Sequence, residues 1–536
     1  MGAPGRTLDF DYIVIGAGSA GCVLANRLSA NPSHRVCLVE GGVKDKSPRI
    51  HVPAGTLSLY VSQKYAHQYK SVPQKHLYGR EIGSPRGRML GGSSSMNSMI
   101  YIRGARSDYD HWAELGCRGW GYDDVLPFFM KSENNQIGQE PQYHGSFGEL
   151  HVNEPRDVHP LSKTFVDAAV EAGESRNDDF NGATFGGVGV YALTQKDGKR
   201  LSSYRAFVAP VLEKRPNLTL LTEATVLQLD LEGAEVLGVT VESGGERLRL
   251  RAAKETVISA GAYGSPQLLL ASGVGDADDL KAVGVEVRHH LPGVGRNLQD
   301  HLDGLVTVRS KSSATLGVSL RAAPRLSVSP FQYLFGKKGL WTTNYVESGG
   351  FASTKYSGGV PDLQFHFVPG YRSPRGKLVE WGHGFAVHTC VLRPRSTGWV
   401  KLSADGSKRN IDIDFNFLSD EQDGLTLVEG LKIARRIFAA SPFKPLRGVE
   451  MAPGPKVRSD DELLDYVRRA CATVFHPSGT CRMGVTDDCV VTPDLKVRGL
   501  GRLRVADASI MPTLVSGNTN APSIMIGEKA AALMLA

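Results

Sequence analysis

Residues 10–42, FDYIVIGAGSAGCVLANRLSANPSHRVCLVEGG, constrain the fold of this chain more than any other segment. The apolar, β-branched run at 12–15 predicts a buried parallel strand, and three glycines in G-x-G-x-x-G spacing follow it. The first glycine allows a tight turn, the second lets the backbone approach a pyrophosphate, and the third lets a helix predicted over 19–30 pack on the strand. The segment therefore predicts a dinucleotide-binding unit.

A second strand, predicted over 35–39, ends at Glu40, where a carboxylate can accept hydrogen bonds from ribose hydroxyls. The helix that follows the glycine turn directs free N–H groups and its positive dipole end at the pyrophosphate. The predicted nucleotide contacts are Gly16, Gly18, Ser19, Ala20, Gly21, Glu40 and Gly41. This unit alone leaves open whether the nucleotide is FAD or NAD.

The length and composition of the whole sequence are typical of a globular protein. At 536 residues it is too long for one core, which predicts two packed domains. We expect neither a transmembrane span nor a signal peptide, because apolar runs are short and residues 1–12 lack an apolar core. The net charge of +7 comes from interspersed bases, which argues against nucleic-acid binding and leaves peripheral contact with anionic lipid open. Seven scattered cysteines without a C-x-x-C pair favour a reduced, cytoplasmic chain with no metal site.

Two kinds of sheet are predicted. Segment 216–258 is typical of a β-meander that returns the chain to the first domain. Between 305 and 465, DLQFHFV (362–368), GFAVHTCVL (384–392), RSTGWVKLS and NIDIDFNFL are typical of an antiparallel sheet, with a helix at 420–440. The predicted fold class is α/β, a Rossmann-like nucleotide-binding domain interleaved with an α+β substrate domain built on an antiparallel sheet. The nucleotide-binding domain takes 1–160, 200–305 and 470–536, and the substrate domain takes 161–199 and 306–469.

Glycine-rich loops and the C-terminal segment supply further candidate site residues. Residues 84–104 form a glycine- and serine-rich loop suited to wrapping a planar cofactor, because it offers many backbone N–H groups. His476 lies in FHPSGTCRMG, and Asn520 precedes Pro522 at the expected start of a helix. Asp507 ends a short strand and is a candidate polar contact for a cofactor phosphate, ribose or ribityl group. The spacing of His476 and Asn520 does not by itself show that they meet.

Four separated blocks carry a family resemblance. They are GAGSAG with Glu40, GRMLGGSSSMN (87–97), GAYGSPQLLLASGVG (261–275), and HPSGTCRMG with GNTNAP. On these blocks the chain resembles the glucose–methanol–choline (GMC) oxidoreductases over essentially its whole length. The resemblance implies FAD, bound by the first block, covered by the second through Gly91, Gly92 and Asn97, and contacted by Met99 just after that block, with the Val226 backbone at the adenine. It also implies that His476 is the catalytic base and that Asn520 contacts the substrate hydroxyl.

One position departs from part of that family. Some members attach FAD covalently through a histidine immediately before the asparagine of the second block, where this chain has Met96. A thioether cannot make that bond, so we expect non-covalent FAD.

The resemblance is to the bacterial alcohol and choline dehydrogenase-like branch. It implies oxidation of primary alcohols, aliphatic or aryl, to aldehydes: His476 takes the hydroxyl proton, a hydride passes to flavin N5, and electrons go to a quinone-like acceptor. Alternatives are an O₂-using oxidase of the hydroxymethylfurfural type, a choline dehydrogenase in which Glu347 pairs with the ammonium group, and a hydroxynitrile-type lyase. Phe475, with Phe365 and Phe367 as further candidates, is predicted to form an apolar wall of the substrate pocket.

Overall fold

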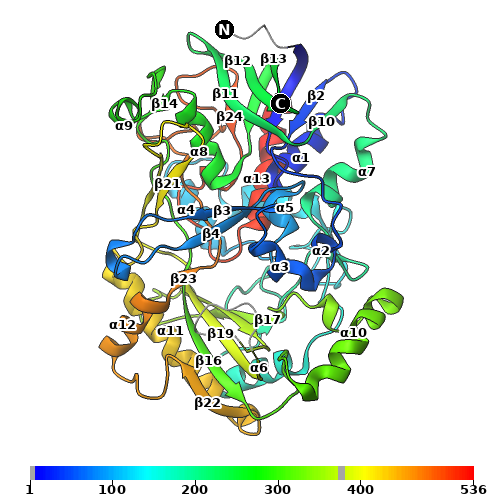
Figure 1. The fold of residues 1–536 in the computed structure, drawn as a ribbon, viewed down its shortest axis with the longest axis vertical. Helices are drawn as coiled ribbons and strands as arrows, with labels where there is room; N and C mark the ends of the chain where they lie inside the picture. The colour runs from blue at the N-terminus through cyan, green and yellow to red at the C-terminus, as the bar shows by residue number, and fades with distance from the viewer. Residues whose placement is uncertain (1–5, 372–380) are drawn as a thin grey trace.

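The computed structural model describes residues 6–371 and 381–536. Residues 1–5 of the N-terminal stretch, where no signal peptide is expected, lie outside this range. Two seven-stranded sheets organise the molecule, one at each end of its long axis, and both termini belong to the upper end in Figure 1. This arrangement confirms the predicted combination of a Rossmann-like domain and an α+β domain.

The upper sheet has the strand order β10-β2-β1-β13-β12-β11, and β24 also pairs with β13. The strands β10, β2, β1, β13 and β24 run parallel, whereas β11, β12 and β13 form an antiparallel meander. Their bounds are β1 Thr7–Ile15, β2 Val36–Val39, β10 Leu218–Leu221, β11 Ala224–Glu232, β12 Glu235–Ser243, β13 Glu246–Ile258 and β24 Leu503–Val505. Only the last three strands of segment 216–258 therefore make the predicted meander, because β10 joins the other edge of the sheet beside β2.

Three helices of the upper domain begin near one another in the fold's central region. They are α1 (Ser19–Leu28), α8 (Gly261–Ala271) and α13 (Asn520–Leu535). Pro266 lies inside α8 and not at its start. Pro266 has no N–H for the Ala262 carbonyl, and the Thr480 hydroxyl donates to that carbonyl instead, at 2.6 Å.

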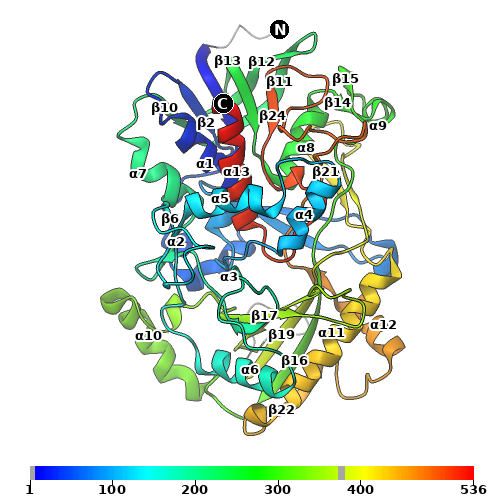
Figure 2. The ribbon, with the colours of Figure 1, turned by 180° about the vertical axis from the view of Figure 1, so that it is seen from behind.

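The lower sheet is antiparallel, with the order β22-β16-β19-β18-β17-β7, and β23 also pairs with β16. Its strands are β7 Gly187–Val190, β16 Leu302–Ser310, β17 Ser348–Ala352, β18 Leu363–Val368, β19 Gly384–Val391, β22 Arg447–Ala452 and β23 Ala472–Thr473. Its core includes apolar residues of α6 (Pro160–Glu171) and α11 (Glu421–Ala439). Figure 2 shows both helices beside this sheet. The strands predicted around 363–368 and 384–391 and the helix near 420–440 are confirmed.

The lower sheet contains a different set of strands from the one predicted. The other two predicted strands, β20 (Trp399–Leu402) and β21 (Ile411–Asp414), pair with each other in a separate ribbon rather than in the large sheet. β16 belongs to the lower sheet from Leu302 onward, and β23 joins it from within the C-terminal segment.

Within the described residues, no helix has the length and apolar character needed to cross a bilayer.

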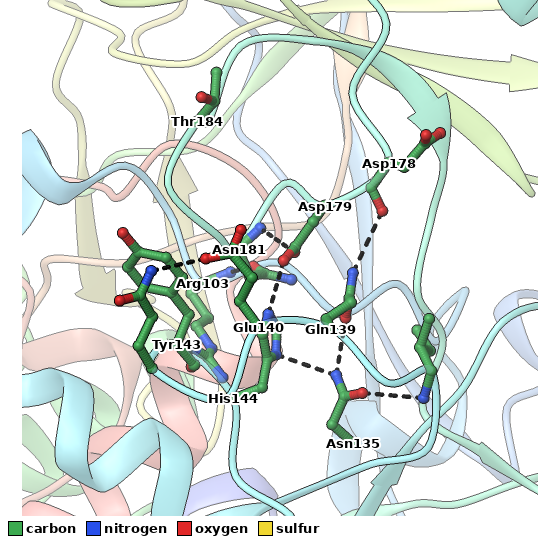
Figure 3. Close-up of polar contacts among 12 residues, drawn as sticks. Arg103, Asn135, Gln139, Glu140, Tyr143, His144, Asp178, Asp179, Asn181 and Thr184 are labelled. Carbon is green, nitrogen blue, oxygen red and sulfur yellow. Dashed lines mark hydrogen bonds and ion pairs between the residues drawn. The ribbon is translucent and has the colours of Figure 1, made fainter.

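A buried polar cluster anchors the end of the glycine-rich loop at Arg103 (Figure 3). Arg103 donates to Glu133 at 2.5 Å, and His144 lies 3.0 Å from a Glu133 carboxylate oxygen. In Figure 3, His144 is directed at Asp179, whose carboxylate oxygen lies 3.0 Å away. Asn181 accepts a hydrogen bond from the Arg103 backbone N–H at 2.9 Å. Since each buried charge has a partner, the cluster avoids the penalty of an isolated buried ion and joins three distant chain segments.

We predict that Gly21→Ala destabilises the protein and weakens nucleotide binding. A Cβ at Gly21 would lie 1.9 Å from the Gly16 carbonyl oxygen, so the helix must move away from the turn. The expected cost is about 1–3 kcal/mol of unfolding free energy, measured by denaturant titration. Gly83→Ala is the matched control, because nothing lies within 4 Å of a Cβ there. Equal stability of the two variants would contradict this packing argument.

Candidate active site

A cavity of about 1140 Å³ lies between the two domains. The upper domain contributes the glycine turn after β1, the edge of β11 and the starts of α8 and α13. The lower sheet contributes Asp303, His366 and His388. Residues 85–88, 92–94 and 96–100 of the glycine-rich loop and residues 472–477 form further parts of the wall. One space thus joins the predicted nucleotide turn to the predicted catalytic histidine.

Most predicted cofactor residues line this cavity. They are Gly16, Gly18, Ser19, Ala20, Glu40, Gly41, Gly92, Asn97, Met99, Val226 and Asp507. Gly21 and Gly91 lie behind the wall: Gly21 packs on Gly16, and the Gly91 N–H donates to the Ala17 carbonyl at 2.8 Å. These two glycines shape the wall, and the others present atoms to the cavity.

Glu40 closes the glycine turn from the side of β2. One of its carboxylate oxygens accepts from the Ala17 N–H at 2.9 Å, and the other accepts from the Gly42 N–H at 2.7 Å. Burial raises the pKa of Glu40 to about 6, against the opposing effect of these two hydrogen bonds. Each carboxylate oxygen retains a further lone pair, so Glu40 can fix the turn and still accept from a ligand hydroxyl.

Asp507 lines the cavity while it anchors neighbouring backbone. One carboxylate oxygen accepts from the Gly261 N–H at 2.8 Å and from the Ser265 hydroxyl at 2.6 Å. The other accepts from the Ser509 N–H at 2.8 Å. These contacts hold the start of α8 against the C-terminal segment.

Arg200 is a residue of this region that the sequence analysis missed. Its guanidinium donates to the Asn97 backbone oxygen at 2.6 Å and to the Asn97 side-chain oxygen at 2.8 Å. It also donates to the Ile50 carbonyl at 3.0 Å and to the Thr56 hydroxyl at 2.6 Å. Burial lowers its pKa to about 10. A lone arginine in KDGKRLSS gives no sequence signal for this role, which depends on contacts with residues 50–97.

His476 is buried at the end of the cavity, in a hydrogen-bonded chain with the His301 side chain and the Leu392 carbonyl. Its Nδ1 lies 2.9 Å from Nδ1 of His301, whose Nε2 lies 2.9 Å from the Leu392 carbonyl oxygen. A carbonyl can only accept, so Nε2 of His301 carries the proton, and Nδ1 of neutral His301 accepts. Nδ1 of His476 must then donate, which leaves its Nε2 unprotonated.

Asn518 is the asparagine that contacts His476. Its side-chain N–H₂ lies 3.1 Å from Nε2 of His476, and its side-chain oxygen accepts from Gln364 at 3.1 Å. Asn520, which the sequence pairs with His476, instead accepts from the Ser19 hydroxyl at 2.8 Å at the start of α13. The sequence GNTNAP holds both asparagines, and the helix start at Asn520 places Asn518 in the preceding loop. The predicted pairing of His476 with Asn520 is therefore not the one that the structure makes.

Burial is the main cause that lowers the pKa of His476 well below its usual value, and nearby His301, His366 and Arg86 act in the same direction. The backbone around it is tightly held. The His476 N–H donates to Asp300 at 2.8 Å, and burial raises the pKa of Asp300 to about 7. Phe475 adopts a left-handed backbone (φ +69°), and its carbonyl accepts from Arg86 at 2.8 Å. A neutral imidazole is therefore held in one orientation.

The predicted substrate-pocket residues separate into two groups. Phe475 lines the cavity and stacks on Tyr60, with ring centroids 5.2 Å apart. Phe365 and Phe367 do not line it: they belong to the core of the lower domain, where Phe367 stacks on Phe165.

Glu347 is absent from the cavity wall. Its carboxylate accepts from the His159 N–H at 2.6 Å, from Ser162 at 3.0 Å and from Thr343 at 2.7 Å. Burial raises its pKa. Glu347, a candidate substrate-pocket residue, therefore does not line the pocket, and the alternative in which it pairs with a substrate ammonium group is not supported, since this buried side chain anchors the start of α6.

A Rossmann-type turn that opens into a cavity ending at a neutral histidine is the arrangement expected of an oxidoreductase that binds a dinucleotide. Two models of the GMC oxidoreductase family match residues 10–303 and 394–527. The chain is 46% identical over 528 residues to an alcohol dehydrogenase (acceptor) of Pseudomonas putida, covering 98% of this chain and 96% of that relative. It is 40% identical over 532 residues to a mitochondrial choline dehydrogenase of Mus musculus, covering 98% and 89%. A solved pyridoxine 4-oxidase from Mesorbium loti superposes with a TM-score of 0.88 at 32% identity, covering 98% of each chain.

The chain belongs to the GMC oxidoreductase family, whose members use FAD and act on CH–OH groups. The cavity fits this cofactor. The N-cap Gly18 carries no side chain over the first N–H groups of α1, which suits a pyrophosphate. A Cβ at Gly92 would lie 2.9 Å from Cα of Gly18, so the loop and the turn approach closely enough to enclose a ligand only without side chains there.

Proposed function

We propose that the protein oxidises primary alcohols, aliphatic or aryl, to aldehydes and passes the electrons to a quinone-like acceptor. The unprotonated Nε2 of His476, directed at Asn518 beside the cavity, is the observation that carries this proposal. The similarity to the alcohol dehydrogenase (acceptor) supports the choice of substrate and acceptor.

The roles proposed for the side chains follow from their hydrogen-bonding capacity. The alcohol oxygen enters between His476 and Asn518, so that Nε2 of His476 accepts the hydroxyl proton in place of the Asn518 N–H. The Asn518 N–H₂ then donates to the alcohol oxygen and stabilises its growing negative charge. His301 accepts from Nδ1 and so keeps the required tautomer. FAD, when bound, supplies the hydride acceptor for the alcohol carbon. Phe475 and Tyr60 exclude water from the apolar part of the alcohol.

A neutral alcohol suits this wall better than choline. Glu347 lies outside the cavity, and Asp303, which lines it near His476, already pairs with His388 and accepts from the Ala472 N–H. A quaternary ammonium group would therefore meet no uncommitted carboxylate in this part of the wall.

The seven cysteines are free thiols, which supports the proposed location in the reducing cytoplasm.

The proposed reaction is tested by anaerobic stopped-flow spectroscopy of the FAD-loaded enzyme. We expect 1-alkanols and benzyl alcohol to bleach the flavin absorbance with a higher kcat/KM than choline gives. Turnover with a soluble quinone should exceed hydrogen peroxide formation in air. Dominant peroxide formation would assign an oxidase, preferential reduction by choline would assign a choline dehydrogenase, and no reduction by any alcohol would exclude all three.

We further propose that FAD is bound without a covalent link. Met96 is buried on the cavity wall at the position where some relatives carry the linking histidine. Acid precipitation should therefore release the yellow cofactor into the supernatant, with its absorbance equal to that of the native flavin. Yellow colour retained in the precipitate would contradict this proposal.

Substitutions distinguish the two asparagines. His476→Ala should slow flavin reduction by about 10²–10⁴-fold, and Asn518→Ala should slow it by about 10²-fold, because each removes a contact with the reacting oxygen. Asn520→Ala should have a much smaller effect on this rate, since Asn520 bonds to Ser19. A larger loss in Asn520→Ala than in Asn518→Ala would reverse these assignments.

Because His476 acts as a base in its neutral form and its pKa is lowered, the rate of flavin reduction by the wild type should stay constant as the pH falls to 6.5.

A further inference from the structure

The helix α10 (Ala323–Gly336) presents an apolar face to solvent. Leu320, just before the helix, is 82% exposed, and Phe331, Leu334 and Phe335 are 62%, 61% and 87% exposed. Val328 is 50% exposed. We call these five residues the α10 face. Spacings of three, four and seven residues place Val328, Phe331, Leu334 and Phe335 on one side of the helix.

This face has no protein partner among the described residues. Ser329 and Tyr333 are the buried residues of α10, and they are not part of the face. In Figures 1 and 2, α10 lies at the outer edge of the lower domain, away from both sheets. Exposure of two phenylalanines and two leucines in one cluster to water is unfavourable in hydrophobic free energy. This indicates that another surface covers the cluster.

The segment around the α10 face is cationic. Between Asp303 and Glu347 the sequence holds no acidic residue and six basic ones, Arg309, Lys311, Arg321, Arg325, Lys337 and Lys338. Of these, Arg309, Lys311, Arg321 and Lys338 are exposed. Asp157 approaches the end of the helix, where its carboxylate accepts from the Gly339 N–H at 2.6 Å. Lys196, Asp197 and Lys199, all exposed, lie on the hairpin whose Gly198 adjoins Lys337, so these residues add one net positive charge.

We propose that the α10 face docks on an anionic lipid bilayer. A helix with phenylalanine and leucine on one side and lysine and arginine around it lies in the interface between headgroups and acyl chains. Each basic residue near such a surface adds electrostatic attraction. A second copy of this chain is a poorer occupant, because a two-fold contact would place the same cations opposite one another.

Docking at this face would bring a wall of the cavity close to the bilayer. After α10, the 3₁₀ turn at Leu340–Thr342 leads to Tyr345 and Val346, which line the cavity. The Tyr345 hydroxyl donates at 2.8 Å to the Ala54 carbonyl, just before the cavity residues Thr56 and Leu57. A lipophilic alcohol or quinone dissolved in the bilayer would then lie near this wall. This consequence rests on the proposed function, whereas the docking itself does not.

The test is cosedimentation of the FAD-loaded enzyme with sucrose-loaded vesicles. Phosphatidylcholine vesicles with about one third phosphatidylglycerol are compared with pure phosphatidylcholine, at low and high salt. We expect strong binding to the anionic vesicles only, weakened by salt. F331S/F335S and R321E/K338E should each lower the partition coefficient by at least about tenfold, because one removes apolar contact and the other removes charge attraction.

Matched controls are Phe147→Ser, at an exposed phenylalanine (99%) outside the face, and Lys281→Glu, at an exposed lysine of α9 (Ala277–Ala282). Both should bind vesicles as the wild type does. Unfolding midpoints and flavin absorbance show that every variant is folded, independently of any alcohol activity. No vesicle binding by the wild type, or wild-type binding by F331S/F335S, would overturn the proposal. Concentration-dependent self-association that F331S/F335S abolishes, without vesicle binding, would assign the face to a second copy.

Discussion

The parallel packing of α1 and α13 is the contact on which the site depends. The Ser19 hydroxyl bonds to Asn520 at their first turns, and Arg27 forms an ion pair with buried Glu528 further along both helices. A Cβ at Gly527 would lie 2.7 Å from the Ala20 carbonyl, so the helices meet at close range only with glycine there. Both helices therefore start at the cavity, and their positive dipole ends act together on any anionic group bound in it.

This packing also explains how Asn518, more than 450 residues from the nucleotide turn, reaches the same cavity. The C-terminal segment leaves β24, is fixed by Asp507 to the start of α8, and enters α13 beside α1. Asn518 lies in the loop just before that helix. Its position beside His476 is thus a consequence of the helix contact, and the hydrogen bonds of His301 and Gln364 set the remaining orientations.

The sequence predicts the parts of the fold whose signals are local. Glycine spacing and β-branched runs predict β1, α1 and β2, and alternation predicts β18 and β19. It does not predict which of two nearby asparagines meets His476, because that depends on where α13 begins. It also suggests a substrate contact for Glu347, whose actual partners, His159 and Ser162, lie far away along the chain. Arg200 has no local signal, since its partners are carbonyl and hydroxyl oxygens of residues 50–97.

The sequence by itself determined the family, the nucleotide turn with Glu40, the identity of the candidate base and the antiparallel character of the second domain. These follow from motifs and periodicity within short segments. Only the tertiary structure decided that Asn518 partners His476, that His301 leaves Nε2 of His476 unprotonated, and that Glu347 is structural. Hydrogen-bond direction and burial depend on atoms contributed by distant segments, and they exist only after the two sheets and the α1–α13 pair have packed.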